Sequence, residues 1–189
     1  MRLAALLLAA GKGQRFGGSK LAAPFRGAPL IDHALSIACA APVGQVLVVA
    51  RDDLCVPSHD PRVEVLRITS DGIAQSLQAG LDALTDADGA FIFLADMPLV
   101  PSGLAAELLA HKSSHLAVQP TFAGKPGHPV LLDRRGFALA ARASGDSGLG
   151  RLLRGRQDVL VVPVNDRGVV CDADTPEALA ALERDAPPA

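Results

Sequence analysis

A glycine-rich segment that also carries basic residues has the clearest chemical signature in this sequence. An apolar run over residues 3–9 is followed by four glycines, Gly11, Gly13, Gly17 and Gly18, with Arg15 and Lys20 among them. Glycine amides in such a loop can approach an anion closely, and Arg15 and Lys20 can neutralise its charge. The segment therefore predicts a buried strand that leads into a polyphosphate-binding loop.

Three other interpretations of this segment compete with that one. A secretory signal would need small residues after the apolar run, where the sequence instead turns basic. Gly11-x-Gly13 fits the start of a dinucleotide fingerprint, but Pro24 and the glycines before it would break the helix that must follow. A GxxxxGK[ST] phosphate loop is disfavoured because Ser19 and Lys20 stand in the reverse order.

Carboxylates that follow two later apolar runs supply a second kind of chemistry. Asp96 ends one run, while Asp172 and Asp174 follow residues 169–171 and would share a side if that strand persisted. Mg²⁺ is usually held by one or two carboxylates together with phosphate oxygens and water. These residues therefore predict a Mg²⁺–triphosphate site, with capping of the next turn or helix as the alternative for Asp96 and Asp174.

Apolar runs and helical patterns alternate along the chain, which predicts an open α/β fold with a mostly parallel sheet covered by helices. The expected strands are 3–9, 45–50, 63–66, 90–95, 116–119, 129–132, 159–162 and 169–171. The expected helices are 30–40, 73–84, 102–110, 135–143, 149–154 and 176–184, the last capped by Thr175. Ligands in such folds bind beyond the carboxyl ends of the strands, here at loops 10–20, 69–76, 95–101 and 172–176.

Length and composition exclude several classes of protein. The 189 residues suit one domain, 1–189, and we expect a frayed tail at 185–189. A net charge of −2 and the absence of Trp and Tyr argue against nucleic acid as a partner. No apolar stretch is long enough to span a membrane. The three cysteines form no CxxC, so neither a zinc site nor a disulfide framework is expected, and a cytoplasmic location fits best.

Segments along nearly the whole chain fit the pattern of one family. They are Leu8-Ala9-Ala10-Gly11 to Lys20, Lys20 to Leu30, Gly72 to Leu81, Leu94-Ala95-Asp96-Met97-Pro98, Gly127-His128-Pro129-Val130, Gly145-Asp146-x-Gly148 and Asp172-x-Asp174-Thr175-Pro176. Together they resemble the MobA/MocA-like nucleotidyltransferases, most closely the molybdenum cofactor cytidylyltransferase branch. The resemblance implies a three-layer α/β/α Rossmann-like fold of the nucleotide-diphospho-sugar transferase type.

The resemblance also implies a role for individual residues. The catalytic residues would be Arg15, Lys20 and Asp96, with the two cations on the triphosphate. The nucleotide would be bound by Ala9, Ala10, Gly11, Gly13, Arg15, Lys20, Ser76 and Asp96. The cofactor Mg²⁺ would be bound by Asp96 with Asp172 or Asp174. His128 and Asp146 would contact the acceptor, unless His128 serves a backbone carbonyl and Asp146 a turn.

The implied reaction moves a nucleoside monophosphate, CMP from CTP, onto a phosphate monoester, molybdopterin or molybdenum cofactor, and releases pyrophosphate. Ala9-Ala10-Gly11 favours CTP, because the guanylyl branch has a Gly-Gly pair there, although cytidylyl members often carry Ser at the position of Gly13. The partners would be CTP or another NTP, a phosphorylated small molecule, and transiently a molybdoenzyme or its chaperone.

Other functions stay open at this point. Guanylyl or sugar-1-phosphate transfer would use the same residue types. An NAD(P)-dependent oxidoreductase would need an acid on the ribose, for which Asp32 has the right spacing but falls at a predicted helix start. A nucleotide-binding regulator without catalysis would have no need of Asp96 and Asp172.

Overall fold

The protein is described by a computed structural model that covers residues 1–11, 13–57, 60–70, 72–145 and 148–185. Its sheet runs in the order β10-β7-β9-β6-β1-β4-β5, with β8 paired to β7. The strands of this sheet are β1 (Leu3–Ala9), β4 (Gln45–Ala50), β5 (Val63–Arg67), β6 (Gly89–Leu94), β7 (Ala117–Phe122), β8 (Lys125–Pro126), β9 (Val130–Asp133) and β10 (Val159–Pro163). The helices are α1 (Leu30–Ala40), α2 (Ile73–Ala83), α3 (Leu104–Ala110), α4 (Arg134–Ala140), α5 (Gly148–Leu153) and α6 (Pro176–Asp185).

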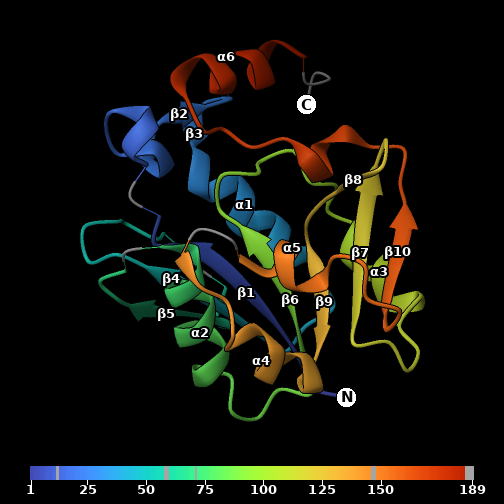
Figure 1. The fold of residues 1–189 in the computed structure, drawn as a ribbon. Coiled ribbons are helices and arrows are strands. Elements are labelled where there is room, and N and C mark those ends of the chain that lie inside the picture. Colours follow the sequence, from blue (N-terminus) through green and yellow to red (C-terminus); the bar gives the residue numbers. More distant parts are fainter. Residues whose placement is uncertain (12, 58–59, 71, 146–147, 186–189) are drawn as a thin grey trace.

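The sheet is mostly parallel, as the sequence predicts. β1 pairs in parallel with β4 on one side and with β6 on the other, so that Leu6 lies opposite both Leu47 and Ile92. β9 is antiparallel to its neighbours β6 and β7. The carboxyl ends of β1, β4 and β6 therefore share one edge of the sheet, and β9 begins at that edge (Figure 1).

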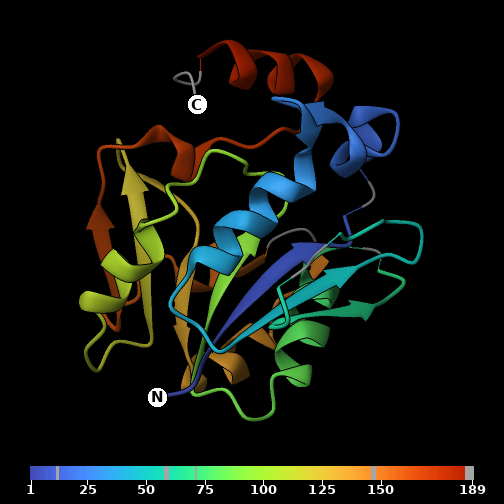
Figure 2. The same ribbon diagram turned by 180° about the vertical axis from the view of Figure 1, so that it is seen from behind.

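The continuous apolar run of β1 follows from burial on both faces of the sheet. Ala5, Leu7 and Ala9 belong to the core on the side of α1, α3 and α6. Leu6 and Leu8 belong to the core on the side of α2, α4 and α5. Figure 1 shows α2, α4 and α5 in front of the sheet, and Figure 2 shows α1 and α3 on its other face. Alternate side chains of one strand thus join two helical layers through the sheet.

A glycine lets α2 approach β1 closely. A Cβ at Gly80 would lie 2.5 Å from the Leu6 Cδ1 atom, well inside van der Waals contact. Any side chain here would push α2 away from the sheet. This packing holds α2 close to β1, and the first residues of α2 supply part of the site.

A small hairpin and the last helix cover the carboxyl edge of the sheet. β2 (Pro24–Phe25) and β3 (Ala28–Pro29) form the hairpin, and the amide of Arg26 donates to Glu183 Oε1 of α6 at 2.8 Å. The amide of Ala178 donates to Thr175 Oγ1 at 3.1 Å, which confirms the predicted cap of α6. The chain just before α6 is thereby held above the ends of the strands (Figure 1).

One predicted strand is wrong, and the others are confirmed. The predicted strand at 169–171 is instead a 3₁₀ turn, η4 (Arg167–Val170). A Cβ at Gly168 would lie 2.0 Å from the carbonyl oxygen of Leu99, so the chain is pressed against the loop that follows β6. The apolar residues are buried by this loop packing rather than by strand pairing. Among the described residues, no helix is both long and apolar enough to cross a membrane.

Candidate active site

The glycine loop after β1 folds back through left-handed backbone at Gly13. Its φ of 56° is unfavourable for residues with a side chain, and a Cβ there would lie 3.3 Å from the Cβ of Lys20. Two short 3₁₀ turns follow, η1 (Gln14–Phe16) and η2 (Lys20–Ala22), and Phe16 packs against the core. The loop thereby presents Arg15 and Lys20 toward the ends of the strands.

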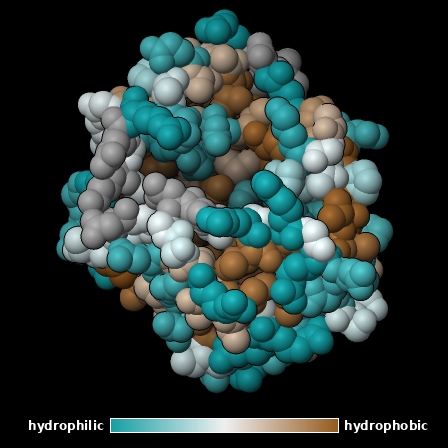
Figure 3. Space-filling view, viewed as in Figure 1, coloured by the Kyte–Doolittle hydropathy of each residue, from teal (hydrophilic) through white to brown (hydrophobic). Residues whose placement is uncertain are grey.

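Residues from all four predicted loops meet around one cavity of about 540 Å³. Its lining comprises Leu8, Ala10, Gly11, Gly13, Arg15, Lys20, Ser70, Gly72, Ile73, Ser76, Leu94, Asp96, Asp172 and Asp174. Figure 3 shows this face of the molecule hollowed below α6, with hydrophobic residues inside the hollow and hydrophilic ones around it. The prediction that the site lies at the carboxyl edge of the sheet agrees with this geometry.

An ion cluster joins the glycine loop to the two carboxylate segments. Lys20 Nζ lies 2.7 Å from Asp96 Oδ2 and 3.1 Å from Asp174 Oδ1. Arg15 Nη1 lies 3.3 Å from Asp174 Oδ2, and its side chain is largely exposed. Asp174 is thus engaged by the cations and does not cap α6, which is the work of Thr175.

The pKa values of Lys20 and Asp172 are both raised in this cluster. Burial alone would lower the pKa of the Lys20 ammonium, but the ion pairs with Asp96 and Asp174 outweigh burial and raise it. Partial desolvation, followed by the negative charges of Asp174 and Asp96, raises the pKa of Asp172. The wall of the cavity therefore carries carboxylates that repel one another.

The carboxylates fit a hard divalent cation. Asp96 Oδ1 is buried and has no hydrogen-bond partner within the described part of the chain, which leaves one strong acceptor without a donor. Oxygen donors of this kind are what Mg²⁺ prefers. No group of three or more His, Cys, Asp or Glu side chains among the described residues is arranged to hold a metal ion. A cation here would therefore complete its shell with oxygens from a ligand.

Asp172 and Asp174 face the cavity although no strand carries them. Residues 171–174 have no regular secondary structure, yet Ala173 between the two carboxylates is fully buried. The amide of Ala173 donates to the carbonyl oxygen of Asp96 at 2.9 Å. This bond aligns the two carboxylate segments, so the predicted alternation survives the loss of the predicted strand.

Ser76 lies at the cavity but is engaged by its own loop. Its hydroxyl lies 3.0 Å from that of Ser70, which in turn donates to the carbonyl oxygen of Gly72 at 2.7 Å. Both serines are buried. Ser70 is a lining residue that the sequence analysis missed, because a single serine in a loop has no distinguishing pattern.

Of the remaining predicted site residues, Ala9 and His128 line cavities next to the main one. Ala9 lines a smaller neighbouring cavity of about 120 Å³ behind the glycine loop. His128 lines another of about 140 Å³, which shares Leu8, Ile73 and Leu94 with the main one. Its Nδ1 lies 3.1 Å from the carbonyl oxygen of Ile92, and burial lowers its pKa. Asp146 lies outside the described residues.

The dinucleotide interpretation finds no support in this arrangement. Asp32, the candidate for the ribose, lies in the first turn of α1 and does not follow a strand. The residue after β4, the next strand of the main sheet along the chain, is Arg51. Asp52 and Asp53 come next, but they lie roughly 40 residues beyond the glycine loop, whereas the acid of the fingerprint follows its glycines by about 20 residues.

Comparisons with known proteins agree with the fold and the motifs. Residues 5–160 match the model of the MobA-like NTP transferase domain. The chain is 30% identical over 198 residues to "Purine catabolism protein PucB" of Bacillus subtilis (strain 168), with 96% of each chain covered. Rv0371c of Mycobacterium tuberculosis H37Rv superposes with a TM-score of 0.85 at 24% identity, over 98% of this chain and 100% of that one. The structure of Rv0371c in complex with manganese superposes with a TM-score of 0.82 at 23% identity, over 98% of this chain and 100% of that one.

Fold and comparisons together define the class as a nucleotidyltransferase with a mostly parallel α/β sheet. The family model begins within β1 and ends within β10, so it spans the glycine loop and Asp96. The chain belongs to the MobA-like NTP transferase family.

Proposed function

We propose that this protein transfers CMP from CTP to a phosphate monoester, molybdopterin or the molybdenum cofactor, with release of pyrophosphate. The observation that supports this most strongly is the convergence of two cations and three carboxylates on one cavity beside a glycine loop. A triphosphate needs cations, backbone amides and a divalent ion with oxygen ligands, and these are the groups that line the cavity.

Each group has a task that follows from its position. The backbone at Ala10, Gly11 and Gly13 would cradle the nucleotide, because these residues line the cavity and carry little side chain. On nucleotide binding, Lys20 would replace its contacts with Asp96 and Asp174 by contacts with phosphate oxygens. Asp96, with Asp172 or Asp174, would hold Mg²⁺, which supplies charge neutralisation at the phosphates when bound.

The chemical step depends on alignment of the acceptor with the nucleotide more than on general acid–base catalysis. An oxygen of the acceptor phosphate bonds to the α-phosphorus of CTP, and the bond from that phosphorus to the β-phosphate oxygen breaks. The acceptor is already an anion near neutral pH, so no strong general base is required. Lys20 and Arg15 would stabilise the charge that grows on the departing pyrophosphate.

The donor base and the acceptor are inferred from less direct observations. Ala10 is buried at the cavity, and its methyl group would narrow the space beside a bound base, which supports CTP over GTP. His128, in the adjoining small cavity, is our candidate for the acceptor side, together with Asp146. The name of PucB refers to purine catabolism and specifies no acceptor.

Cofactor, compartment and partners complete the proposal. Rv0371c has been crystallised with manganese, which supports a divalent ion in the family, and we propose Mg²⁺ here. We propose a cytoplasmic location, in which thiols such as those of Cys39, Cys55 and Cys171 stay reduced. We further propose that residues 1–189 act as one domain, in transient contact with a molybdoenzyme or its chaperone.

Pyrophosphate release with a panel of nucleotides tests the proposal. The protein is incubated with CTP, GTP, ATP or UTP, with Mg²⁺, and with molybdopterin, molybdenum cofactor or glucose 1-phosphate as acceptor. The expected result is release with CTP and a pterin acceptor, none without acceptor, and none in EDTA. Release that requires glucose 1-phosphate would favour sugar-nucleotide synthesis instead.

Exchange of Ala10 for glycine tests the steric account of the donor base. Removal of one methyl group at a specificity pocket changes discrimination by roughly ten- to two-hundredfold. Ala10→Gly should therefore move the ratio of kcat/KM for CTP and GTP toward GTP while activity with CTP remains. An unchanged ratio, or wild type that uses both nucleotides equally, would refute this account and return guanylyl transfer to consideration.

A further inference from the structure

A small cavity of about 140 Å³ adjoins the nucleotide cavity on the face of the sheet that α2 and α5 cover. Figure 1 shows α5 in front of β6 and β9 at this place. The two cavities share Leu8, Ile73 and Leu94 as a common wall. The rest of the lining of the small cavity consists of Leu77, Ile92, His128, Gly148, Leu149 and Gly150. A ligand in the nucleotide cavity could therefore reach past the common wall into the smaller one.

The lining of the small cavity suits an uncharged ring and not a phosphate group. Among its described lining residues, only His128 has a polar side chain, and none is a lysine or an arginine. Burial lowers the pKa of His128 from its ordinary value of 6.5, so the imidazole is neutral near pH 7. An anion in this cavity would lose its hydration without gaining a cation as partner.

Two parts of the fold hold His128 in place. Its amide donates to the carbonyl oxygen of Val169 in η4 at 2.9 Å, and a Cβ at the preceding Gly127 would clash with the same oxygen. The side chain is half-buried, and its Nδ1 lies 3.1 Å from the carbonyl oxygen of Ile92 in β6. The imidazole is therefore oriented before any ligand binds, which lowers the entropic cost of binding.

The contact with Ile92 also decides which nitrogen of the imidazole carries the proton. A carbonyl oxygen only accepts hydrogen bonds, so Nδ1 of His128 must be the donor. In a neutral imidazole the other nitrogen, Nε2, is then an acceptor. Nε2 has no hydrogen-bond partner in the part of the chain that the structure describes. The small cavity thus combines apolar walls with one acceptor that a ligand can use.

We propose that this cavity binds the ring of the acceptor substrate, as a planar, uncharged heterocycle that donates a ring N–H to His128 Nε2. The inference rests on the proposed nucleotidyl transfer, in which the acceptor phosphate reacts in the nucleotide cavity. Asp96 of that cavity is close enough for its charge to act on the His128 imidazole, so one small molecule can reach both. His128 is then a specificity-determining residue, because a ring without an N–H would leave Nε2 unpaired.

Two ring probes that differ only in their N–H groups test the proposal. Lumazine has two ring N–H groups, and in 1,3-dimethyllumazine both carry a methyl group instead. With lumazine, amide chemical shifts of the full-length, ¹⁵N-labelled protein should change saturably at Ile73, Leu94, Leu149 and Gly150. Lumazine should bind about five- to tenfold more tightly than its methylated form, which corresponds to one hydrogen bond between neutral groups. Shifts confined to residues 10–20, or lumazine bound no more tightly than 1,3-dimethyllumazine, would overturn the proposal.

The ¹⁵N signal of the His128 side chain gives a direct readout of the proposed contact. In the unliganded protein at pH 7, Nε2 should show the shift of an unprotonated nitrogen. That signal should move on titration with lumazine and stay in place with 1,3-dimethyllumazine. A protonated Nε2 in the unliganded protein would contradict the proposal, because it could not accept the N–H of a ring.

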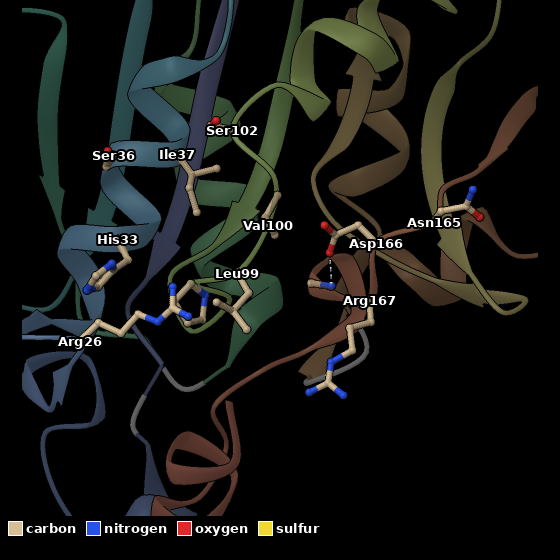
Figure 4. Close-up of a pocket in the computed structure, with 12 residues that line it drawn as sticks. Arg26, His33, Ser36, Ile37, Leu99, Val100, Ser102, Asn165, Asp166 and Arg167 are labelled. Carbon is tan, nitrogen blue, oxygen red and sulfur yellow. Dashed lines mark hydrogen bonds between the residues drawn. The ribbon is translucent and has the colours of Figure 1, made fainter. Parts of the chain in front are cut away.

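Matched histidine variants separate the hydrogen bond from the bulk of the methyl groups. His128→Phe should weaken lumazine about five- to tenfold and leave 1,3-dimethyllumazine within about twofold. His33→Phe is the control, since Nε2 of His33 also lies near a backbone carbonyl oxygen, that of Phe25 at 2.8 Å. His33 is on α1, on the other face of the sheet (Figure 4), and its exchange should leave both affinities unchanged. An equal loss for the two probes in His128→Phe, or for lumazine in the two variants, contradicts the assignment.

A cavity-filling variant decides the matter if His128→Phe does not fold. A Cβ at Gly150 of α5 would meet no atom within 4 Å, so Gly150→Leu has room for its side chain at the cavity. It should weaken lumazine about tenfold or more, because the apolar space is taken. Unchanged affinity for lumazine would contradict the ring site. The shift in melting temperature with CTP and Mg²⁺ should persist in this variant, and its absence from wild type would count against the proposed function instead.

Discussion

Two lysine–aspartate ion pairs, at opposite edges of the sheet, look alike in isolation. Lys20 Nζ lies 2.7 Å from Asp96 at the carboxyl edge, and Lys112 Nζ lies 2.8 Å from Asp133 at the other edge. The side chains are 12% and 22% exposed in the first pair and 8% and 18% in the second. Distance and burial therefore do not distinguish the two pairs.

The surroundings of the two pairs differ in the balance of charge. Asp133 accepts from Lys112, from Arg135 Nε at 2.8 Å and from the Arg135 amide at 3.0 Å, where it caps α4. Lys20 instead faces two carboxylates, Asp96 and Asp174, and Asp96 keeps a buried oxygen without a donor among the described residues. Asp133 thus accepts hydrogen bonds on both carboxylate oxygens, whereas Asp96 has a buried oxygen with no donor among the described residues.

The shifts in pKa show what this difference means. Burial would raise the pKa of Asp133, but its bonds to Lys112 and Arg135 outweigh burial and hold it at about 2. Desolvation and neighbouring carboxylates raise the pKa of Asp172. The pair at Asp133 stabilises the fold, whereas the cluster at Asp96 retains unfavourable charge that a bound cation would relieve.

The largest expected effect separates the two lysines. Lys20→Ala should lower kcat/KM for pyrophosphate release by roughly ten- to a hundredfold, because a charge-assisted phosphate contact is lost. Lys112→Ala, matched in residue type and burial, should lower the melting temperature and leave kcat/KM within about twofold, since it lies far from the transition state. Equal kinetic losses in the two variants would remove the functional distinction between the pairs.

The stability that the Lys112–Asp133 pair contributes should decrease at acid pH. Because the pKa of Asp133 is about 2 when folded and 3.8 in its ordinary state, its contribution is complete above pH 4 and is lost as the pH falls toward 2. Asp133→Asn should cost about 1–2 kcal/mol at pH 7, after allowance for solvent screening. Urea unfolding at pH 7 and pH 2.5 measures this difference. A cost that is as large at pH 2.5 as at pH 7 would argue against an ionic origin.

The smallest effect has the opposite sign. The pKa of Asp172 is raised above its ordinary value of 3.8 in the folded state. Its ionised form therefore lowers the stability of the fold fully above the raised pKa and not at all below the ordinary one. Asp172→Asn should therefore raise the melting temperature at pH 7 by about 1–2 °C and by nothing near pH 3. Destabilisation at pH 7 would mean that Asp172 is a structural residue.

Most of the sheet was predictable because burial on both faces leaves a strong mark on the sequence. All residues of β1 are buried, so its run is continuous and could be recognised directly. The turn at 167–170 could not be distinguished from a strand, since a short apolar run is compatible with either. The position of β9 between β6 and β7 depends on long-range pairing that leaves no local pattern.

The candidate site was predictable to the extent that its residues follow strands. The glycine loop, Asp96, Asp172 and Asp174 stand at the ends of apolar runs, and the structure brings them to one cavity. The cross-links between them, such as the bonds from Lys20 to both Asp96 and Asp174, join residues 76 and 154 positions apart. No spacing rule covers such distances, so the unsaturated state of Asp96 emerges only from the folded chain.

The most direct test of the central claim is the shift in melting temperature caused by CTP with Mg²⁺. A ligand at a hundred times its dissociation constant stabilises by about 2.7 kcal/mol, which is roughly 5–10 °C for a chain of this size. Wild type and Asp133→Asn should both show this shift with Mg²⁺ and lose it in EDTA. Asp96→Asn should show little shift in either condition. If Asp96→Asn is stabilised as much as wild type, the ion cluster at Asp96 is not the nucleotide–metal site.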